Sequence, residues 1–127
     1  MGCSAMQRAL GGDATSQTVG NEVGALEMAT RSTRIIADTL RNLRQLPDDT
    51  VDSIRMVLGR SDTACTSARA LLQAGDVSAA ASLVHSAQAE FANDVAIGQA
   101  LTQAEQLLRD PNVRAALRVI RVGGHLD

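Results

Sequence analysis

The sequence predicts an all-α fold, either a bundle or an array of helical hairpins. Alanine and leucine are the most frequent residues, and aromatic residues make up only 1% of the 127-residue chain. Helices accept alanine and leucine readily, whereas strands draw on aromatic and β-branched side chains. Apolar residues also recur at spacings of three, four and seven between short polar breaks. We therefore expect one long N-terminal helix and about five shorter antiparallel helices.

The length suits one domain with a modest core. We expect a flexible N-terminal arm at residues 1–18, a single helical domain at 19–122 and a short C-terminal tail at 123–127. Each buried alanine removes little apolar area from water, so an alanine-rich core is thin. We expect that a neighbouring chain completes it.

The long helix is expected from Val19 to Leu46, just before Pro47, which cannot continue a helix. One row of residues recurs every seven positions and comprises Val19, Leu26, Thr33 and Leu40. A second row lies three residues later and comprises Ala29, Ile36 and Leu43. Glu22 interrupts the second row, which predicts an imperfect coiled-coil seam.

Two shorter helices are expected between Pro47 and Gly75. The first ends at Gly59 and the second at Gly75, because glycine commonly terminates helices. Their expected N-caps are Asp48 or Asp49 for the first helix and Ser61 or Asp62 for the second.

Asp76 is expected to cap the next helical segment, residues 77–109, which could form one helix or two. The apolar stripe steps by six residues from Phe91 to Ile97, and this step turns the apolar face around the helix axis. Asn93 and Asp94 lie at the step. We therefore favour two helices with a boundary there.

A final helix is expected to begin at Asp110 and Pro111, an N-cap residue followed by proline at the first helical position. Opposite its apolar face lies a basic stripe of Arg109, Arg114, Arg118 and Arg121. Such a stripe can meet phosphates or an acidic protein, although a solvated helix face is the commoner explanation. The net charge of −2 and the lack of lysine and stacking aromatics argue against nucleic-acid binding.

Residues 64–91 resemble one tetratricopeptide helix pair. Gly75 and Asp76 occupy the position of that family's inter-helix turn, and Ala80 and Ala87 its two small positions in the second helix. No second copy follows at a 34-residue offset. The resemblance implies close helix–helix packing and no particular function.

No catalytic, cofactor-binding or metal-binding motif is present in the sequence. Most aspartates precede expected helices, where a carboxylate caps backbone amides and needs no catalytic explanation. Cys65 and His85 could at most form an interhelical site, and no spacing of histidine, cysteine or glutamate is typical of a metal centre. We expect no enzymatic activity and no cofactor.

The leading hypothesis is a non-catalytic helical interaction or assembly subunit, such as an adaptor, a chaperone-like protein or a structural component. It would bury apolar helix faces against itself or a protein partner, and its expected interface residues are Leu26, Ile36, Leu40 and Leu43. Two alternatives are a nucleic-acid-associated regulator that uses the basic stripe and a small-ligand binder or enzyme with an interhelical site. No small-molecule substrate is predicted.

The sequence gives little indication of a membrane or secretory location. No apolar run is long enough for a transmembrane span, and the N-terminus lacks the pattern of a signal peptide. Gly2 and Cys3 are typical of acylated proteins, but Met6 departs from the myristoylation pattern. The two cysteines, Cys3 and Cys65, form no disulfide framework, so we expect the cytoplasm or another reducing compartment.

Overall fold

The computed structural model describes residues 15–112, 114 and 115. Within them lie four α-helices: α2 (Ser16–Asn42), α3 (Asp48–Gln73), α4 (Val77–Asn93) and α5 (Val95–Arg109). Residues 111, 112, 114 and 115 are helical as well, and the described part of the chain contains no strand. The all-α prediction is therefore confirmed, although the number of helices is smaller than expected.

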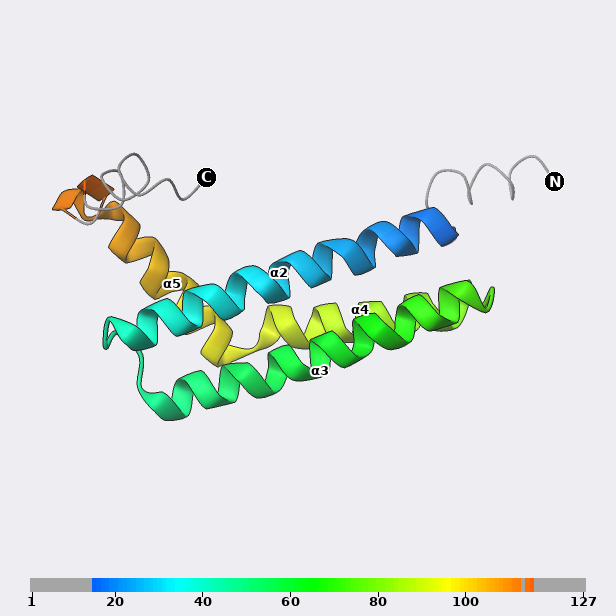
Figure 1. Cartoon of the computed structure of the whole chain (residues 1–127), viewed down its shortest axis with the longest axis horizontal. Coiled ribbons are helices and arrows are strands. Elements are labelled where there is room, and N and C mark those ends of the chain that lie inside the picture. Colours follow the sequence, from blue (N-terminus) through cyan, green and yellow to red (C-terminus); the bar gives the residue numbers. More distant parts are fainter. Residues whose placement is uncertain (1–14, 113, 116–127) are drawn as a thin grey trace.

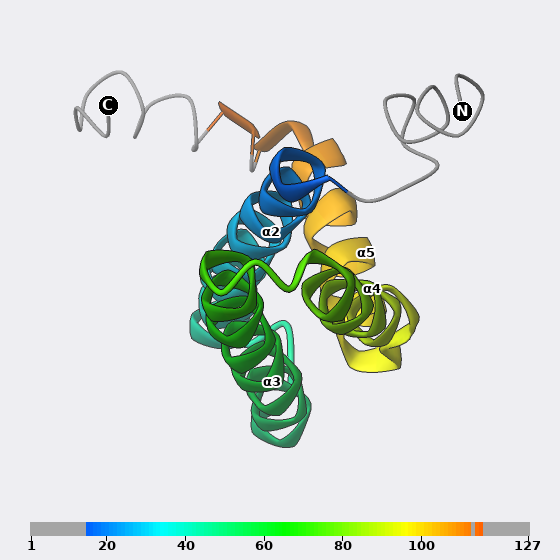
Figure 2. The ribbon, with the colours of Figure 1, turned by 90° about the vertical axis from the view of Figure 1, so that its right-hand side faces the viewer.

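The two long helices, α2 and α3, run antiparallel and form a hairpin (Figure 1). α4 returns along α3 over one half of the hairpin (Figure 1) and packs against both long helices, and the view along the bundle shows the three helices side by side (Figure 2). α5 then leaves α4 at an angle and packs against α2 and α3 at the other half. None of these described helices is both long and apolar enough to cross a membrane.

α2 begins at Ser16, because the Thr15 hydroxyl accepts a hydrogen bond of 3.0 Å from the Thr18 amide and caps the helix. It therefore begins three residues before the expected position, and it ends four residues earlier than expected, at Asn42. The expected seven-residue row is buried along its whole length, but the prediction of the second row was wrong. The buried second row lies four residues after the first and comprises Val23, Thr30 and Ala37.

α3 is one continuous helix, so the prediction of two helices with a break after Gly59 was wrong. Glycine in a helix costs about 1 kcal/mol relative to alanine, and here buried neighbours on both sides offset that cost. Leu58, directly before Gly59, and Ser61, two residues after it, both face the core. Neither Ser61 nor Asp62 caps a helix, because Asp62 pairs with Arg34 of α2 instead.

The N-cap of α3 is Pro47, which provides no side-chain hydrogen bond, and the acidic residues Asp48 and Asp49 lie in the first turn. The N-cap was expected at Asp48 or Asp49, and it lies at the residue directly before them. The two carboxylates still lie where the helix dipole favours negative charge.

The same type of turn ends both long helices. After α3, the Asp76 amide bonds to the Leu71 carbonyl at 2.8 Å, and Gly75 adopts a left-handed φ of 84°. After α2, the Gln45 amide bonds to the Leu40 carbonyl at 2.7 Å, and the left-handed position is occupied by Arg44 with φ 58°. A residue with a Cβ atom is strained in this conformation, so the two turns differ in their cost.

The boundary between α4 and α5 lies at the expected place. Asp94 is the only residue between the two helices, and its carboxylate accepts a hydrogen bond of 2.9 Å from the Ile97 amide. Asp76 caps α4 in the same way through the Ala79 amide. The expected cap at Asp110 is also present, because its carboxylate accepts from the Asn112 amide at 2.8 Å.

The core consists of two clusters, one in each half of the hairpin. Cluster 1 lies under α4 and contains Val19, Val23, Leu26, Cys65, Ala68, Ala80, Ala81, Val84 and Ala87. Cluster 2 lies under α5 and contains Ala37, Leu40, Ile54, Val57, Leu58, Ile97 and Ala100. The half-buried ring of Phe91, at the end of α4, packs against both.

Candidate protein-interaction surface

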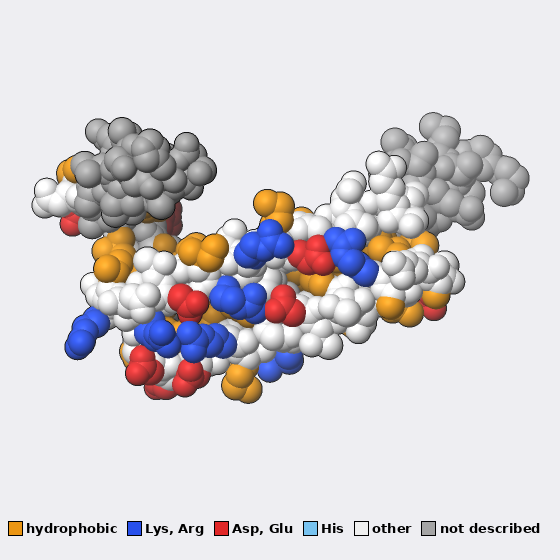
Figure 3. Space-filling model, viewed as in Figure 1, with side chains coloured by type: hydrophobic (Ala, Val, Ile, Leu, Met, Phe, Trp, Pro, Cys, Tyr) orange, Lys and Arg blue, Asp and Glu red, His pale blue; other side chains and the backbone are white. Residues whose placement is uncertain are grey.

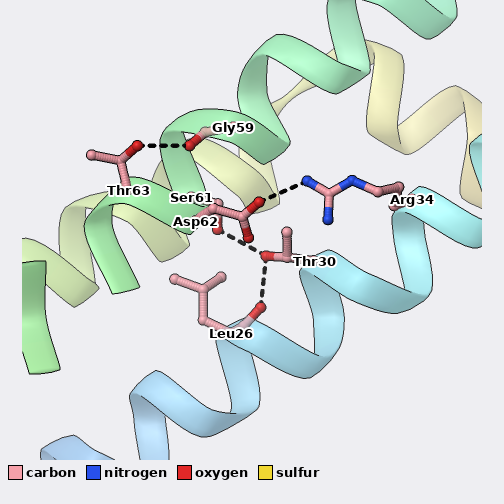
Figure 4. Close-up of polar contacts among 7 residues, drawn as sticks. All are labelled: Leu26, Thr30, Arg34, Gly59, Ser61, Asp62 and Thr63. Carbon is pink, nitrogen blue, oxygen red and sulfur yellow. Dashed lines mark hydrogen bonds and ion pairs between the residues drawn. The ribbon is translucent and has the colours of Figure 1, made fainter. Parts of the chain in front are cut away.

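A buried polar layer crosses the hairpin between the two clusters (Figure 4). The Thr30 hydroxyl donates to the Leu26 carbonyl at 2.7 Å and lies 2.9 Å from the Ser61 hydroxyl of α3. Thr33, the third buried polar residue, lies one turn further along α2. Polar residues at core positions of paired helices fix which residues face each other, because any other register leaves a buried hydroxyl without a partner.

Charged side chains flank the seams between the helices. Four arginine–carboxylate pairs join different helices: Arg34–Asp62, Arg55–Asp38 and Arg69–Glu27 between α2 and α3, and Arg60–Glu90 between α3 and α4. His85 Nε2 of α4 also lies 3.1 Å from Glu22 Oε2 of α2. Blue and red side chains are accordingly interleaved where α2 and α3 meet (Figure 3).

The pair Arg69–Glu27 has the best geometry of the four, because Arg69 Nε also donates to Glu27 Oε2 at 2.8 Å. The hydrogen bonds from Arg69 lower the pKa of Glu27 below its ordinary value of 4.5. The same contact raises the pKa of Arg69, and the hydrogen bond to Asp38 raises the pKa of Arg55. These groups remain charged at neutral pH and are engaged within the bundle.

The opposite side of α2 presents a surface with few charges. We call this the α2 outer face, and it comprises Asn21, Gly24, Ala25, Met28, Arg31, Ser32, Ile35 and Thr39. Spacings of three, four and seven place these residues on one stripe, away from the buried row. Met28 and Ile35 are 64% and 61% exposed, and a Cβ atom added at Gly24 would meet nothing within 4 Å.

The four interface residues predicted from the sequence differ in their exposure in the structure. Leu26 and Leu40 are buried within the chain, with 4% and 2% of their surface exposed, so they belong to its own core. Ile36 is half-buried against cluster 2. Leu43 is 55% exposed at the C-cap of α2. Of the four, Leu43 alone offers substantial apolar surface to a partner.

The predicted basic stripe is described only in part. Arg109 is exposed and lies 3.5 Å from Glu105 in the same helix, and Arg114 donates to the Arg109 carbonyl at 3.3 Å. Arg118 and Arg121 lie outside the described residues. The basic stripe as a binding surface remains a prediction.

Cys65 and His85 do not come together as a site. Cys65 is buried in cluster 1 with its sulfur 3.9 Å from the Val23 carbonyl oxygen, and burial raises the pKa of its thiol. A thiol of this kind is a poor nucleophile at neutral pH. His85 is exposed and faces Glu22, and no group of three potential metal ligands occurs among the described residues.

No protein-family model, curated protein sequence or solved structure matches this chain. The α2 outer face was missed in the sequence, although the seven-residue spacing of Met28 and Ile35 was visible there. Met28 and Ile35 can be placed on the outer side of α2 only once the row from Val19 to Leu40 is known to be buried.

Proposed function

We propose that this protein is a non-catalytic helical interaction subunit that binds a helix of another protein chain through the α2 outer face. The observation that carries the proposal is the exposure of Met28 and Ile35 on a stripe whose one charged side chain is Arg31. The centres of protein interfaces are depleted in lysine and acidic residues and enriched in methionine, arginine and aromatic residues. The α2 outer face contains no lysine or acidic residue, and it carries both a methionine and an arginine.

The packing chemistry of this face suits another helix. Met28 and Ile35 lie seven residues apart, which is the repeat with which helices pack side by side. Small residues beside them, Gly24 and Ala25 before Met28 and Ser32 between the two, allow a second backbone to approach closely. Covering two side chains of this size stabilises a complex by about 1.5–3 kcal/mol for each fully buried side chain.

The non-catalytic part of the proposal rests on Cys65 and His85, the cysteine and the histidine that lie among the described residues. Cys65 is enclosed by apolar side chains and its thiol pKa is raised, while His85 is directed to Glu22. A buried free thiol also suits the reducing compartment that we propose for this protein.

The test replaces both exposed side chains with charged ones, as Met28→Glu with Ile35→Glu. The wild-type chain is expected to form an oligomer in size exclusion with light scattering, or to retain a specific protein in affinity capture. The double variant is expected to lose that association, while its circular dichroism and melting temperature remain close to wild type because both positions are exposed.

The matched control adds the same two charges at the same spacing on α4, as Ser82→Glu with Ala89→Glu, at two exposed positions. This control is expected to associate like the wild type. A monodisperse wild-type monomer that captures no protein contradicts the proposal. Equal loss of association in both double variants contradicts the assignment to α2.

A further inference from the structure

One residue, Asp94, separates α4 from α5, and it serves as the C-cap of the first helix and the N-cap of the second. Its φ of −72° and ψ of 123° differ from helical values mainly in ψ. A rotation at this single residue would therefore convert the two helices into one. A continuous helix over residues 77–109 would be about 50 Å long, at 1.5 Å per residue.

The apolar residues of the two helices would point in nearly opposite directions in such a helix. The core-facing stripe of α4 contains Val77, Ala80, Val84, Ala87 and Phe91, and that of α5 contains Ile97, Ala100, Ala104 and Leu107. At 100° per residue, the two stripes are roughly 160° apart. A straightened chain thus keeps α4 on its own hairpin and presents α5 to a molecule on the other side.

α5 is attached to its own hairpin mainly by apolar contacts. Ile97 and Ala100 are its fully buried residues, and Gln103 Nε2 donates to Gln45 Oε1 at 2.8 Å. No ion pair joins α5 to another helix among the residues that the structure describes. Open grooves border the attachment, one between α5 and the α2–α3 turn and one beside Asp94.

We infer that two copies of this chain exchange their α5 helices. The α4–α5 boundary straightens at Asp94, and the α5 of each copy occupies the groove over cluster 2 of the other. The groove is formed by Ala37, Leu40, Ile54, Val57 and Leu58. This exchange goes beyond the proposed function, because it does not use the α2 outer face.

The physical basis is that exchange preserves the contacts of α5 with α2 and α3 and gives up only those with α4. Each α5 meets the same groove residues in the dimer as in the monomer, so the balance depends on the boundary residue and on concentration. The monomer keeps the Asp94 cap, and the dimer gains helical hydrogen bonds across residue 94. Short connections of this kind favour domain exchange.

Val95 provides a way to prevent straightening. Val95 is the first residue of α5 and is 76% exposed, and proline is well tolerated at a first helical position that follows an extended residue. Within a continuous helix, proline at residue 95 would remove one hydrogen bond and clash with the preceding turn. Val95→Pro is therefore expected to weaken exchange on the order of 100-fold per chain, and Val95→Ala is its matched control.

Asp94→Ala has the opposite expected effect. It removes the cap that only the bent form uses and places a strong helix former at the boundary. Loss of an N-cap shifts the equilibrium between the bent and the continuous form about fivefold. Each dimer contains two such boundaries, so the dimerisation constant is expected to rise roughly 25-fold. The measurement is light scattering coupled to size exclusion across a concentration series, after refolding at high protein concentration.

A cross-linking experiment identifies the exchanged helix directly. In a Cys3→Ser background, chains with Gln45→Cys are refolded together with chains carrying Gln103→Cys, and a short bis-maleimide is added. These two positions lie next to each other only where α5 occupies its groove. Exchange predicts a cross-linked pair of chains, which Val95→Pro in both chains abolishes and Val95→Ala retains.

The outcomes separate this inference from the proposed function. Inter-chain cross-linking that survives Met28→Glu with Ile35→Glu supports exchange without the α2 outer face. Association that is lost in that double variant but unchanged by Val95→Pro supports the proposed function and overturns exchange. Mixed chains that do not cross-link, while one chain carrying both cysteines cross-links internally, also overturn exchange.

Discussion

The two halves of the α2–α3 hairpin are covered by helices that are attached in different ways. α4 covers cluster 1, and its residues His85 and Glu90 reach partners on α2 and α3, respectively. α5 covers cluster 2 mainly through Ile97 and Ala100, with no ion pair to another helix among the described residues. α4 is thus held on the hairpin by ion pairs and apolar contacts, whereas α5 is held mainly by apolar contacts.

This difference concerns where each helix lies along the hairpin. Both clusters contain fully buried side chains, yet polar contacts fix the position of α4 along the hairpin. Exposed ion pairs contribute only about 0–1 kcal/mol each, so their main effect here is on register and not on total stability. We expect α5 to be released before the other three helices separate, because it buries two residues whereas α4 buries four.

The largest expected effect comes from deleting an isoleucine side chain in cluster 2. Ile54→Ala on α3 is expected to lower the global free energy of unfolding by about 3 kcal/mol, since the hairpin cannot refill the cavity. Ile97→Ala removes an equally buried side chain from α5. It is expected to release α5 locally and to lower the global free energy less, as urea denaturation will show. Equal losses would indicate that α5 unfolds together with the hairpin.

The polar layer that separates the two clusters gives the next effect. Thr30→Val is expected to cost about 2 kcal/mol, because it leaves the buried Ser61 hydroxyl without its partner. Ser61→Ala is expected to cost about 1 kcal/mol, because the Thr30 hydroxyl keeps its bond to the Leu26 carbonyl. The double variant should cost no more than Thr30→Val alone. A strictly additive double-mutant cycle would rule out direct coupling of these residues.

A substitution in the turn after α2 is expected to stabilise the protein, because the left-handed position there is not glycine. The corresponding position after α3 is already glycine. Arg44→Gly should raise the free energy of unfolding by about 0.5–1 kcal/mol, because glycine tolerates the φ of 58° without strain. Arg44→Ala is the control, since it also removes the arginine side chain but keeps a Cβ atom. Thermal denaturation that ranks alanine equal to glycine would contradict this explanation.

The smallest effect concerns pH and the α2–α3 seam over cluster 1. The pKa of Glu27 is lower in the folded chain than its ordinary value of 4.5, so its pairing stabilises the fold above that pH. This contribution is lost as pH falls through the folded pKa, and Glu27→Gln should remove it. The expected difference is a few tenths of a kcal/mol at neutral pH, because the pair is partly exposed. A variant with unchanged pH dependence of stability would contradict this role.

The helical boundaries that depend on local chemistry could be predicted from the sequence. Asp76 and Asp94 cap helices as expected, because an N-cap requires only a carboxylate and the amides that follow it. The six-residue step from Phe91 to Ile97 also identified the boundary at Asp94. These features depend on a few neighbouring residues, and the sequence contains all of them.

Features that depend on tertiary packing could not be predicted in the same way. Gly59 reads as a helix end in isolation, but buried neighbours and the Arg34–Asp62 pair extend the helix through it. The expected interface residues Leu26 and Leu40 pack within the chain, since α4 and α5 fold back on the hairpin. Met28 and Ile35 emerge as the exposed pair only once the buried face of α2 is known.

Native-state hydrogen exchange tests the central claim, which is that α5 is a separable cover on a firmly joined three-helix unit. We predict that amides in the middle of α5, such as those of Leu101 and Glu105, exchange through a local opening. Their opening free energy should be clearly lower than that of the core amides of α2, α3 and α4, which should share the global value. Opening free energies in α5 equal to those of Leu58 and Val84 would contradict the claim.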